Sequence, residues 1–214
     1  MNLKEIFKDY FLSWFHEPEF DYSQLSGKKR QKPIKLSGEF DYGRALGLYR
    51  YDSTPNKTIL GEFMYRFKYK DDEKCGQAIA EYLMEFLESE QLLESADFIT
   101  TVPVALTNRK FIVMRYIVEQ FDETVQKKYR PDLLIRKKYS SEIKDITDIN
   151  ERKISSGKKF AVKSGFDIEN KNIILIDDIY DSGATLNACG HALKEAGANQ
   201  IMAITITSTG RKAR

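Results

Sequence analysis

The stretch IILIDDIYDSGATLN, residues 173–187, decides how this sequence is interpreted. Its apolar beginning is typical of a buried strand, and it leads directly into two adjacent acids, Asp177 and Asp178. A short turn of small and polar residues follows at 181–185, and from there the pattern is helical. A strand, a pair of carboxylates and a glycine-containing turn into a helix therefore form one unit, which is the candidate binding site.

The turn at 181–185 is suited to hold a phosphate. The first N–H groups of a helix lack intrahelical acceptors and lie at the positive end of the helix dipole. Gly183 lets the backbone approach a ligand closely, and the hydroxyls of Ser182 and Thr185 add donors. Two acids next to a phosphate would repel it, so they are better explained by ribose hydroxyls or a magnesium ion. The unit predicts a sugar phosphate ligand, whereas the simpler interpretation is that Asp181 or Ser182 only caps the helix.

The remaining sequence alternates strands with helices. The late strands are apolar on both faces, which indicates a parallel sheet covered by helices on both sides. Ligands of such sheets bind at the carboxyl ends of the strands, where the two acids are expected. We expect the main domain at 45–214, preceded by a helix and an irregular connector at 1–44. The expected strands cover 45–51, 97–104, 133–136, 172–176 and 200–207, and the expected helices cover 59–69, 76–93, 109–126 and 183–196.

Composition excludes several other classes of site and partner. The net charge of +2 is too small to indicate a nucleic-acid or membrane partner. Cys75 and Cys189 have no paired spacing, so no disulfide framework is expected, and neither His16 nor His191 lies near a Cys-x2-Cys pair that would indicate zinc. No apolar run approaches the ~18 residues of a membrane span. We therefore expect a cytoplasmic protein without a membrane partner.

The first residues suggest an interaction surface. Large apolar side chains recur at helical spacing between residues 3 and 15, so we expect an amphipathic helix there. Its apolar face is expected to pack on the domain, on a second copy in a homodimer, or on another protein. The basic run at 28–32 gives only weak support for a nucleic-acid partner, because such runs are usually solvated loops.

Residues 173–185 resemble the signature of type I phosphoribosyltransferases, in which a hydrophobic strand, two acids and a Thr/Ser-Gly turn bind phosphoribosyl pyrophosphate. The resemblance implies a doubly wound parallel sheet with a small N-terminal hood. It also implies a Mg²⁺-dependent transfer of the phosphoribosyl group to a nitrogen nucleophile, with a nucleobase as candidate acceptor, and release of pyrophosphate. Further segments resemble the ComF-like branch in order and spacing: LGLYRYD at 46–52, FMYRFKYKDDEKCGQAIAEYL at 63–83, VPVAL at 102–106, ERKISSGKKFAV at 151–162 and TLNACGHALKEAGA at 185–198.

The resemblance also implies residue roles. Asp177 and Asp178 would hold the ribose hydroxyls, directly or through Mg²⁺, and Asp181 would assist a purine-like acceptor as the catalytic base. Lys68 matches a family lysine expected near the mouth of the site, although a surface lysine with a packed stem is the alternative. Apart from the resemblance, the charged and polar composition of residues 137–159 predicts a mobile loop, which would close over the site and exclude water. The 5′-phosphate would be held by Asp181, Ser182, Gly183, Ala184 and Thr185, and the candidates for the pyrophosphate are Val104, Ala105, Arg109, Lys110 and Arg115.

This sequence also departs from the family pattern. The four-cysteine zinc element that usually begins ComF-like proteins has no counterpart here. The stretch Arg-Gly-Phe-Asn of the family is replaced by MRYI at 114–117, and an expected asparagine is Ser155. These differences support a second hypothesis, in which the protein is a non-catalytic sensor of phosphoribosyl pyrophosphate or a nucleotide. Such a sensor would act on a partner in DNA uptake or another nucleic-acid process.

Overall fold

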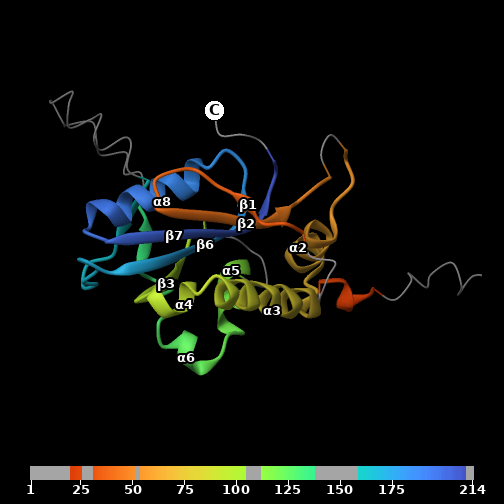
Figure 1. Cartoon of the computed structure of the whole chain (residues 1–214), viewed down its shortest axis with the longest axis horizontal. Helices are drawn as coiled ribbons and strands as arrows, with labels where there is room; N and C mark the ends of the chain where they lie inside the picture. The colour runs from red at the N-terminus through yellow and green to blue at the C-terminus, as the bar shows by residue number, and fades with distance from the viewer. Residues whose placement is uncertain (1–19, 26–30, 52–53, 105–111, 138–158, 211–214) are drawn as a thin grey trace, which may run out of the picture.

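A five-stranded sheet forms the centre of the computed structural model, which describes residues 20–25, 31–51, 54–104, 112–137 and 159–210 (Figure 1). Its order is β1-β2-β7-β6-β3; β2, β7, β6 and β3 run parallel, and β1 pairs with β2 in the antiparallel sense. The α/β fold with a mainly parallel sheet is thus confirmed. The strands are β1 (Ile34–Lys35), β2 (Tyr42–Leu48), β3 (Phe98–Thr101), β6 (Asn172–Tyr180) and β7 (Gln200–Ser208).

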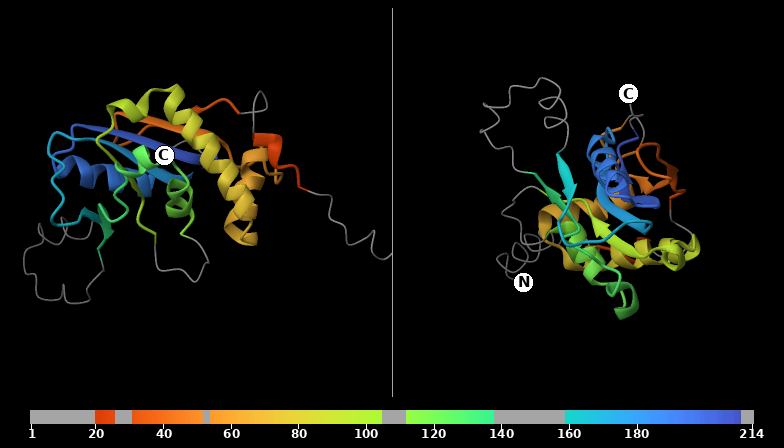
Figure 2. Two further views of the ribbon diagram at one scale, coloured as in Figure 1. Left: turned by 90° about the horizontal axis from the view of Figure 1, so that it is seen from below. Right: turned by 90° about the vertical axis from the view of Figure 1, so that its left-hand side faces the viewer.

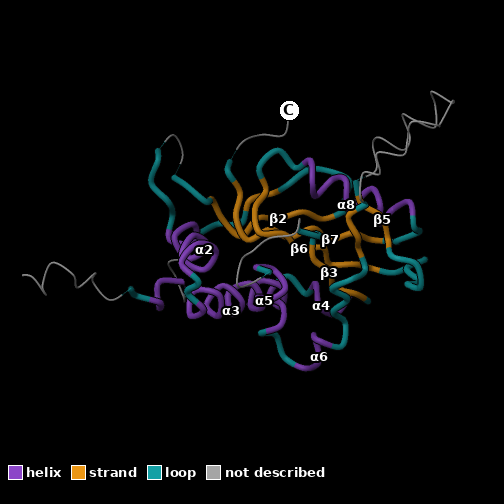
Figure 3. Tube along the Cα trace, turned by 180° about the vertical axis from the view of Figure 1, so that it is seen from behind, coloured by secondary structure: helices purple, strands orange, loops and turns teal. Residues whose placement is uncertain are grey.

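Helices cover both faces of this sheet. Helix α8 (Ala184–Glu195) lies on one face, and α2 (Ile59–Lys70), α3 (Glu73–Ser89) and α5 (Val113–Glu119) lie on the other, as Figures 1 and 3 show. Strand β6 contributes side chains to the cores on both faces of the sheet. Ile173 and Leu175 belong to the core cluster around α8, and Ile174 and Ile176 belong to the cluster around α3. This alternation follows from the two-residue period of a strand.

Shorter elements complete the described chain. Strands β4 (Leu134–Arg136) and β5 (Phe160–Val162) form an antiparallel pair that lies beside the parallel sheet, with β5 in contact with α8 (Figure 2). The other short elements are η1 (Tyr22–Leu25), α4 (Leu92–Ser95) and α6 (Glu123–Gln126). Among the described helices, none combines the length and the apolar character that crossing a membrane requires.

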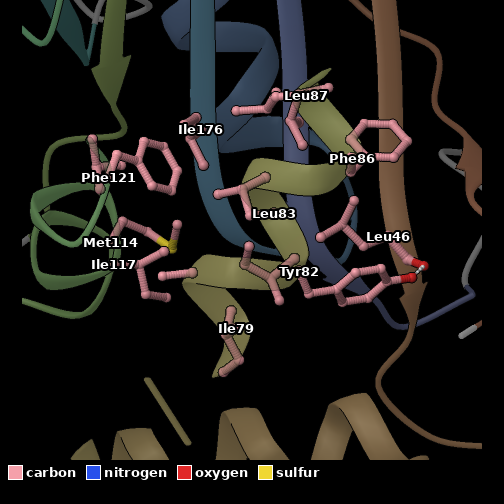
Figure 4. Close-up of a cluster of buried hydrophobic side chains, with 14 of the residues drawn as sticks. Leu46, Ile79, Tyr82, Leu83, Phe86, Leu87, Met114, Ile117, Phe121 and Ile176 are labelled. Atoms are coloured by element: carbon pink, nitrogen blue, oxygen red, sulfur yellow. Dashed lines mark hydrogen bonds between the residues drawn. The ribbon is translucent and has the colours of Figure 1, made fainter. Parts of the chain in front are cut away.

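Helix α3 forms the centre of the larger core cluster. Asp72 caps its first turn by accepting a hydrogen bond from the N–H of Cys75. The Tyr82 hydroxyl donates to the carbonyl of Leu46 at 3.2 Å, which ties the helix to β2. Figure 4 shows the apolar face of α3, with Ile79, Tyr82, Leu83, Phe86 and Leu87, packed against Leu46 of β2, Ile176 of β6, Met114 and Ile117 of α5, and Phe121 just after α5.

Helix α2 carries a polar side chain toward the carboxyl ends of the strands. Thr58 caps the helix by accepting from the N–H of Gly61, and Asp71 ends it in a left-handed conformation with φ 52°. Phe63 and Phe67 are fully buried, at 0% and 1% exposure, so the helix is held firmly against the core. Lys68 follows directly in its last turn. Packing of α2 therefore fixes the point from which this lysine extends.

Several expected boundaries differ from the structure. The helix expected at 76–93 divides at Gln91, which adopts a left-handed φ of 55°, and the helical stretch expected at 109–126 becomes α5 and α6 in its described part. Strand β6 extends four residues beyond Ile176, because its pairing with β7 continues to Tyr180 opposite Ser208. The acid pair therefore lies within a strand rather than after it.

The N-terminal segment 1–44 is described at residues 20–25 and 31–44. The helix at 3–15 lies outside the described residues, as do the basic residues 28–30. Residues 31–44 are packed with the main domain, because β1 pairs with β2 and because Leu36 and Phe40 are buried in the cluster around α8. The expected boundary after residue 44 falls inside β2. The division into a hood and a main domain stays a prediction.

Candidate functional site

The candidate site lies where β3 ends beside the longer strand β6. The β3–β6 pairing stops at Thr101 opposite Ile176, and the N–H of Val102 then donates to the carbonyl of Ile176 at 3.0 Å. Strand β6 continues past this point along β7, so Asp177 and Asp178 follow the last pairing with β3. A cavity of about 560 Å³ opens here.

Five segments of the chain line this cavity. They are the end of α2, the residues after β3, the start of α5, the β4–β5 pair, and the continuous stretch from β6 into α8. The lining residues are Lys68, 102–104, 112–114, Arg136, Lys159, Phe160 and 177–186. The structure thus brings the acid pair, the turn at 181–185 and several basic side chains into one space.

The two acids belong to opposite faces of the sheet. By strand alternation Asp177 lies on the face covered by α8, and Asp178 on the face covered by α2 and α3. The N–H of Asp178 donates to Oδ1 of Asp177 at 2.8 Å. From α2, Nζ of Lys68 donates to Oδ2 of Asp178 at 2.5 Å, and each of these two side chains is 19% exposed. The pair therefore borders the cavity from both sides of β6.

Burial changes the acid chemistry of Asp177. Loss of solvation raises the pKa of the Asp177 carboxyl to about 7, and the negative charge of Asp178 adds to this rise. The hydrogen bond from the N–H of Asp178 and the charge of Lys68 lower that pKa, with smaller effects. A cation or a hydrogen-bond donor entering the cavity would favour the ionised carboxylate.

The turn into α8 has the geometry of an anion-binding helix start. Gly183 is the N-cap with φ 76°, a left-handed conformation that glycine adopts readily, and its carbonyl accepts the first helical bond from Asn187 at 2.8 Å. The N–H groups of residues 184–186, which come before that first bond, have no acceptor within the helix. Tyr180 supports the turn: its hydroxyl donates to the carbonyl of Ser37 at 3.0 Å, and a Cβ at residue 183 would lie 2.6 Å from that hydroxyl.

The N-cap residue of α8 is Gly183 rather than Asp181. Gly183 occupies the N-cap position without a side-chain cap, and Oδ1 of Asp181 accepts a hydrogen bond from the hydroxyl of Thr209 at 2.8 Å. The hydroxyl of Ser182 accepts only a long bond of 3.4 Å from the N–H of Ala184. Asp181 also lines the cavity. Asp181 therefore borders the cavity just before the N-cap residue, and its role stays a prediction.

Of the five residues expected to bind pyrophosphate, the structure describes two, and one of these two lines the cavity. Val104 lines the cavity and is 49% exposed. Arg115 lies outside the cavity lining, because α5 buries Met114 and Ile117 and turns Arg115 outward, where its Nε donates to Glu119 at 2.9 Å. Ala105, Arg109, Lys110 and most of the expected closing segment lie outside the described residues.

Two basic residues of the cavity were not identified from the sequence. Arg136 ends β4 and Lys159 precedes β5, and the antiparallel pairing of these strands brings them together although they lie far apart along the chain. The N–H of Lys137 donates to the carbonyl of Lys159 at 3.0 Å. The available signal was the presence of basic residues at both ends of the polar segment 137–159.

The donor set suits a magnesium ion that is shared with a ligand. Asp177 and Asp178 supply carboxylate oxygens, the donor type that Mg²⁺ prefers. Within the described part of the chain, no group of three or more His, Cys, Asp or Glu residues could hold a metal. Mg²⁺ is commonly bound by one or two carboxylates together with substrate phosphates, and the residues present fit that arrangement.

A comparison with protein families assigns most of the chain to one family. A model of the phosphoribosyl transferase domain matches residues 74–214. This chain belongs to the phosphoribosyl transferase domain family. The family predicted from residues 173–185 is thus confirmed, and membership indicates a transferase.

Individual relatives are distant. The competence protein ComFC of Streptococcus pneumoniae is 29% identical over 147 residues, which cover 69% of this chain and 62% of that protein. A hypoxanthine phosphoribosyltransferase structure from Staphylococcus aureus has a TM-score of 0.40 at 18% identity, covering 64% of this chain and 65% of the other. A glutamine phosphoribosylpyrophosphate amidotransferase from B. subtilis has a TM-score of 0.39 at 19% identity, covering 73% and 30%. The chain therefore spans less than two thirds of the length of these relatives.

Proposed function

We propose that this protein binds phosphoribosyl pyrophosphate with Mg²⁺ and transfers the phosphoribosyl group to a nitrogen nucleophile, releasing pyrophosphate. The observation that carries the proposal is the shared cavity, in which the acid pair of β6, the glycine turn into α8 and the basic residues of the β4–β5 pair meet. Each feature is common alone. Together they offer partners for the hydroxyls, the 5′-phosphate and the diphosphate of one ligand.

The binding roles follow from the chemistry of each group. The N–H groups at 182–185 and the hydroxyls of Ser182 and Thr185 bind the 5′-phosphate at the positive end of α8. The carboxylates of Asp177 and Asp178 accept hydrogen bonds from the ribose hydroxyls. The diphosphate is held by the backbone after β3, at 102–104, and by the positive charges of Arg136 and Lys159.

The transfer step requires a proton acceptor near the incoming nitrogen. The nitrogen lone pair forms the bond to the anomeric carbon while the C–O bond to the leaving group breaks, and the bonding electrons leave with pyrophosphate. Asp181 accepts the proton of the attacking nitrogen, and the Thr209 hydroxyl holds one oxygen of its carboxylate. A bound magnesium ion would supply positive charge that stabilises the departing pyrophosphate.

A second candidate function is a non-catalytic sensor of the same ligand. It is favoured by the apolar character of the cavity wall at 112–114 and by the outward position of Arg115, because residues 112–115, the part of this wall that the structure describes, present no positive side chain to a leaving group. The sensor would act on a protein partner, or on nucleic acid in a process such as DNA uptake. The helix expected at 3–15 is the proposed contact for a homodimer or partner. For either function, a cytoplasmic location is proposed.

One titration series separates these functions. Isothermal titration with phosphoribosyl pyrophosphate, with and without Mg²⁺, tests binding, and pyrophosphate release measured across a set of nucleobases tests transfer. Mg²⁺-dependent binding with release of pyrophosphate supports the enzyme. Binding with no release for any base supports the sensor. Absence of binding at millimolar ligand would overturn both.

A further inference from the structure

The acid pair of the cavity already has a cation beside it. Nζ of Lys68 contacts Oδ2 of Asp178 at 2.5 Å, and both side chains are mostly shielded from solvent. Lys68 comes from α2, 110 residues earlier in the chain, so the contact depends on the tertiary fold. An ammonium group and a divalent metal ion seek the same carboxylate oxygens. They cannot occupy one position next to Asp178 at the same time.

The lysine is able to leave without movement of its helix. Phe63, Met64 and Phe67 are buried and hold α2 against the core. The lysine side chain is a flexible four-carbon stem with a compact charge, so rotation of the stem alone removes the ammonium from Asp178. The Lys68–Asp178 contact can therefore break while helix α2 stays in place.

Charge balance explains why the exchange requires an anionic ligand. The described cavity lining holds three basic side chains, Lys68, Arg136 and Lys159, together with three carboxyl groups, those of Asp177, Asp178 and Asp181. Arrival of a metal ion alone would add two positive charges while Lys68 stays close by. Arrival of a metal ion together with a polyphosphorylated sugar adds negative charge, which the displaced ammonium group can approach.

We propose that Lys68 is an internal counter-ion of Asp178 that Mg²⁺ must displace, so that metal binding is conditional on the sugar diphosphate. This inference rests on the proposed function, because it takes Asp178 as a metal and ribose ligand. Its consequence is thermodynamic coupling between the two ligands. Coupling is reciprocal, so phosphoribosyl pyrophosphate strengthens metal binding by the same factor by which the metal strengthens binding of phosphoribosyl pyrophosphate.

The test measures Mn²⁺ binding to the full chain by the loss of the electron paramagnetic resonance signal of the free ion. The parent is expected to bind Mn²⁺ alone weakly, and Lys68→Met is expected to bind it about tenfold more tightly, because the competing cation is gone. In the parent, saturating phosphoribosyl pyrophosphate should increase Mn²⁺ affinity by about tenfold or more. In Lys68→Met this increase should shrink.

Matched variants test whether the effect is specific to the Lys68–Asp178 pair. Lys70→Met removes an exposed lysine from the same turn of α2 and should leave Mn²⁺ binding unchanged. Adding Asp178→Asn to Lys68→Met should abolish the gained affinity, which locates the metal at Asp178. Lys68→Gln keeps an uncharged donor for Asp178 and gives the same comparison if Lys68→Met does not fold.

The outcomes distinguish this inference from the proposed function. Equal or weaker Mn²⁺ binding by folded Lys68→Met and Lys68→Gln would overturn the counter-ion role, even if the parent binds phosphoribosyl pyrophosphate. Tighter Mn²⁺ binding by the variants, in a protein that binds no phosphoribosyl pyrophosphate, would uphold the counter-ion role and overturn the proposed function.

Discussion

The substitution Gly183→Ala tests how the turn into α8 is held. The left-handed φ of 76° would cost an alanine about 1–2 kcal/mol. The new Cβ would also lie 2.6 Å from the hydroxyl oxygen of Tyr180 and 2.8 Å from its Cζ. The Tyr180 side chain is 5% exposed, and its hydroxyl donates a hydrogen bond to the carbonyl of Ser37, so packing and this bond oppose its displacement. Displacing a packed side chain costs about 1–3 kcal/mol.

The two effects together predict a loss of about 2–5 kcal/mol in the free energy of unfolding, by addition of the two ranges. For a domain of this size that loss lowers Tm by roughly 4–20 °C. Thermal denaturation followed by circular dichroism measures it, and titration with ribose 5-phosphate measures the accompanying loss of affinity. We expect weaker ligand binding because the displaced turn no longer presents its N–H groups in one direction.

Gly165→Ala provides the matched control. Gly165 has φ 94°, and a Cβ there would meet no atom within 4 Å, so this variant carries the backbone strain without the contact. It should lose only about 1–2 kcal/mol. Equal stability losses in the two variants would refute the claim that Tyr180 restrains the turn. Undiminished binding of ribose 5-phosphate by Gly183→Ala would refute the assignment of this turn to the phosphate.

Three further predictions concern the acids of the cavity. The double variant Asp177→Asn/Asp178→Asn should keep its fold by circular dichroism but lose Mg²⁺-dependent binding of phosphoribosyl pyrophosphate in calorimetry; unchanged affinity would remove the ribose and metal roles. Asp181→Asn should bind this ligand normally and lose about 10²–10⁴ in turnover with a purine-like acceptor, because an amide cannot take the proton; unimpaired turnover would exclude Asp181 as the base. The pKa of Asp177 is raised to about 7, so between pH 4 and 7 this carboxyl holds a proton in the folded chain that it loses in the unfolded chain. The contribution of this carboxyl to the free energy of unfolding is therefore lost as the pH rises through that window. The stability of Asp177→Asn relative to the parent, measured by urea denaturation, should therefore rise from pH 4 to 7, and a pH-independent difference would contradict the raised pKa of this carboxyl.

Local sequence was sufficient to predict the strand and the turn that line the cavity. The apolar run before Asp177 predicted a buried central strand, and β6 is one. Gly183 predicted a tight turn, and it takes a left-handed conformation at the start of α8. These predictions depend on neighbours in the chain: side-chain alternation in a strand, and the freedom of glycine to adopt positive φ.

The ends of strands and helices were predicted less well where contacts with distant parts of the chain determine them. The strand through Asp177 continues to Tyr180 because β7 offers partners up to Ser208, and nothing local to residues 177–180 specifies that length. Likewise, the outward direction of Arg115 depends on which face of α5 the core covers. A helical pattern identifies an apolar face but does not say which cavity the opposite face meets.

The sequence by itself determined the family, the parallel α/β architecture and the identity of the acid pair and its turn, because their signals are contiguous along the chain. Only the tertiary structure decided which distant side chains share the cavity. The contact of Lys68 with Asp178 depends on how α2 packs, the presence of Arg136 and Lys159 depends on the β4–β5 pairing, and the bond from Thr209 to Asp181 depends on β7 lying beside β6. Charges and hydrogen-bond donors act over a few ångströms in space, whatever their separation in sequence, so folding determines which of them act together.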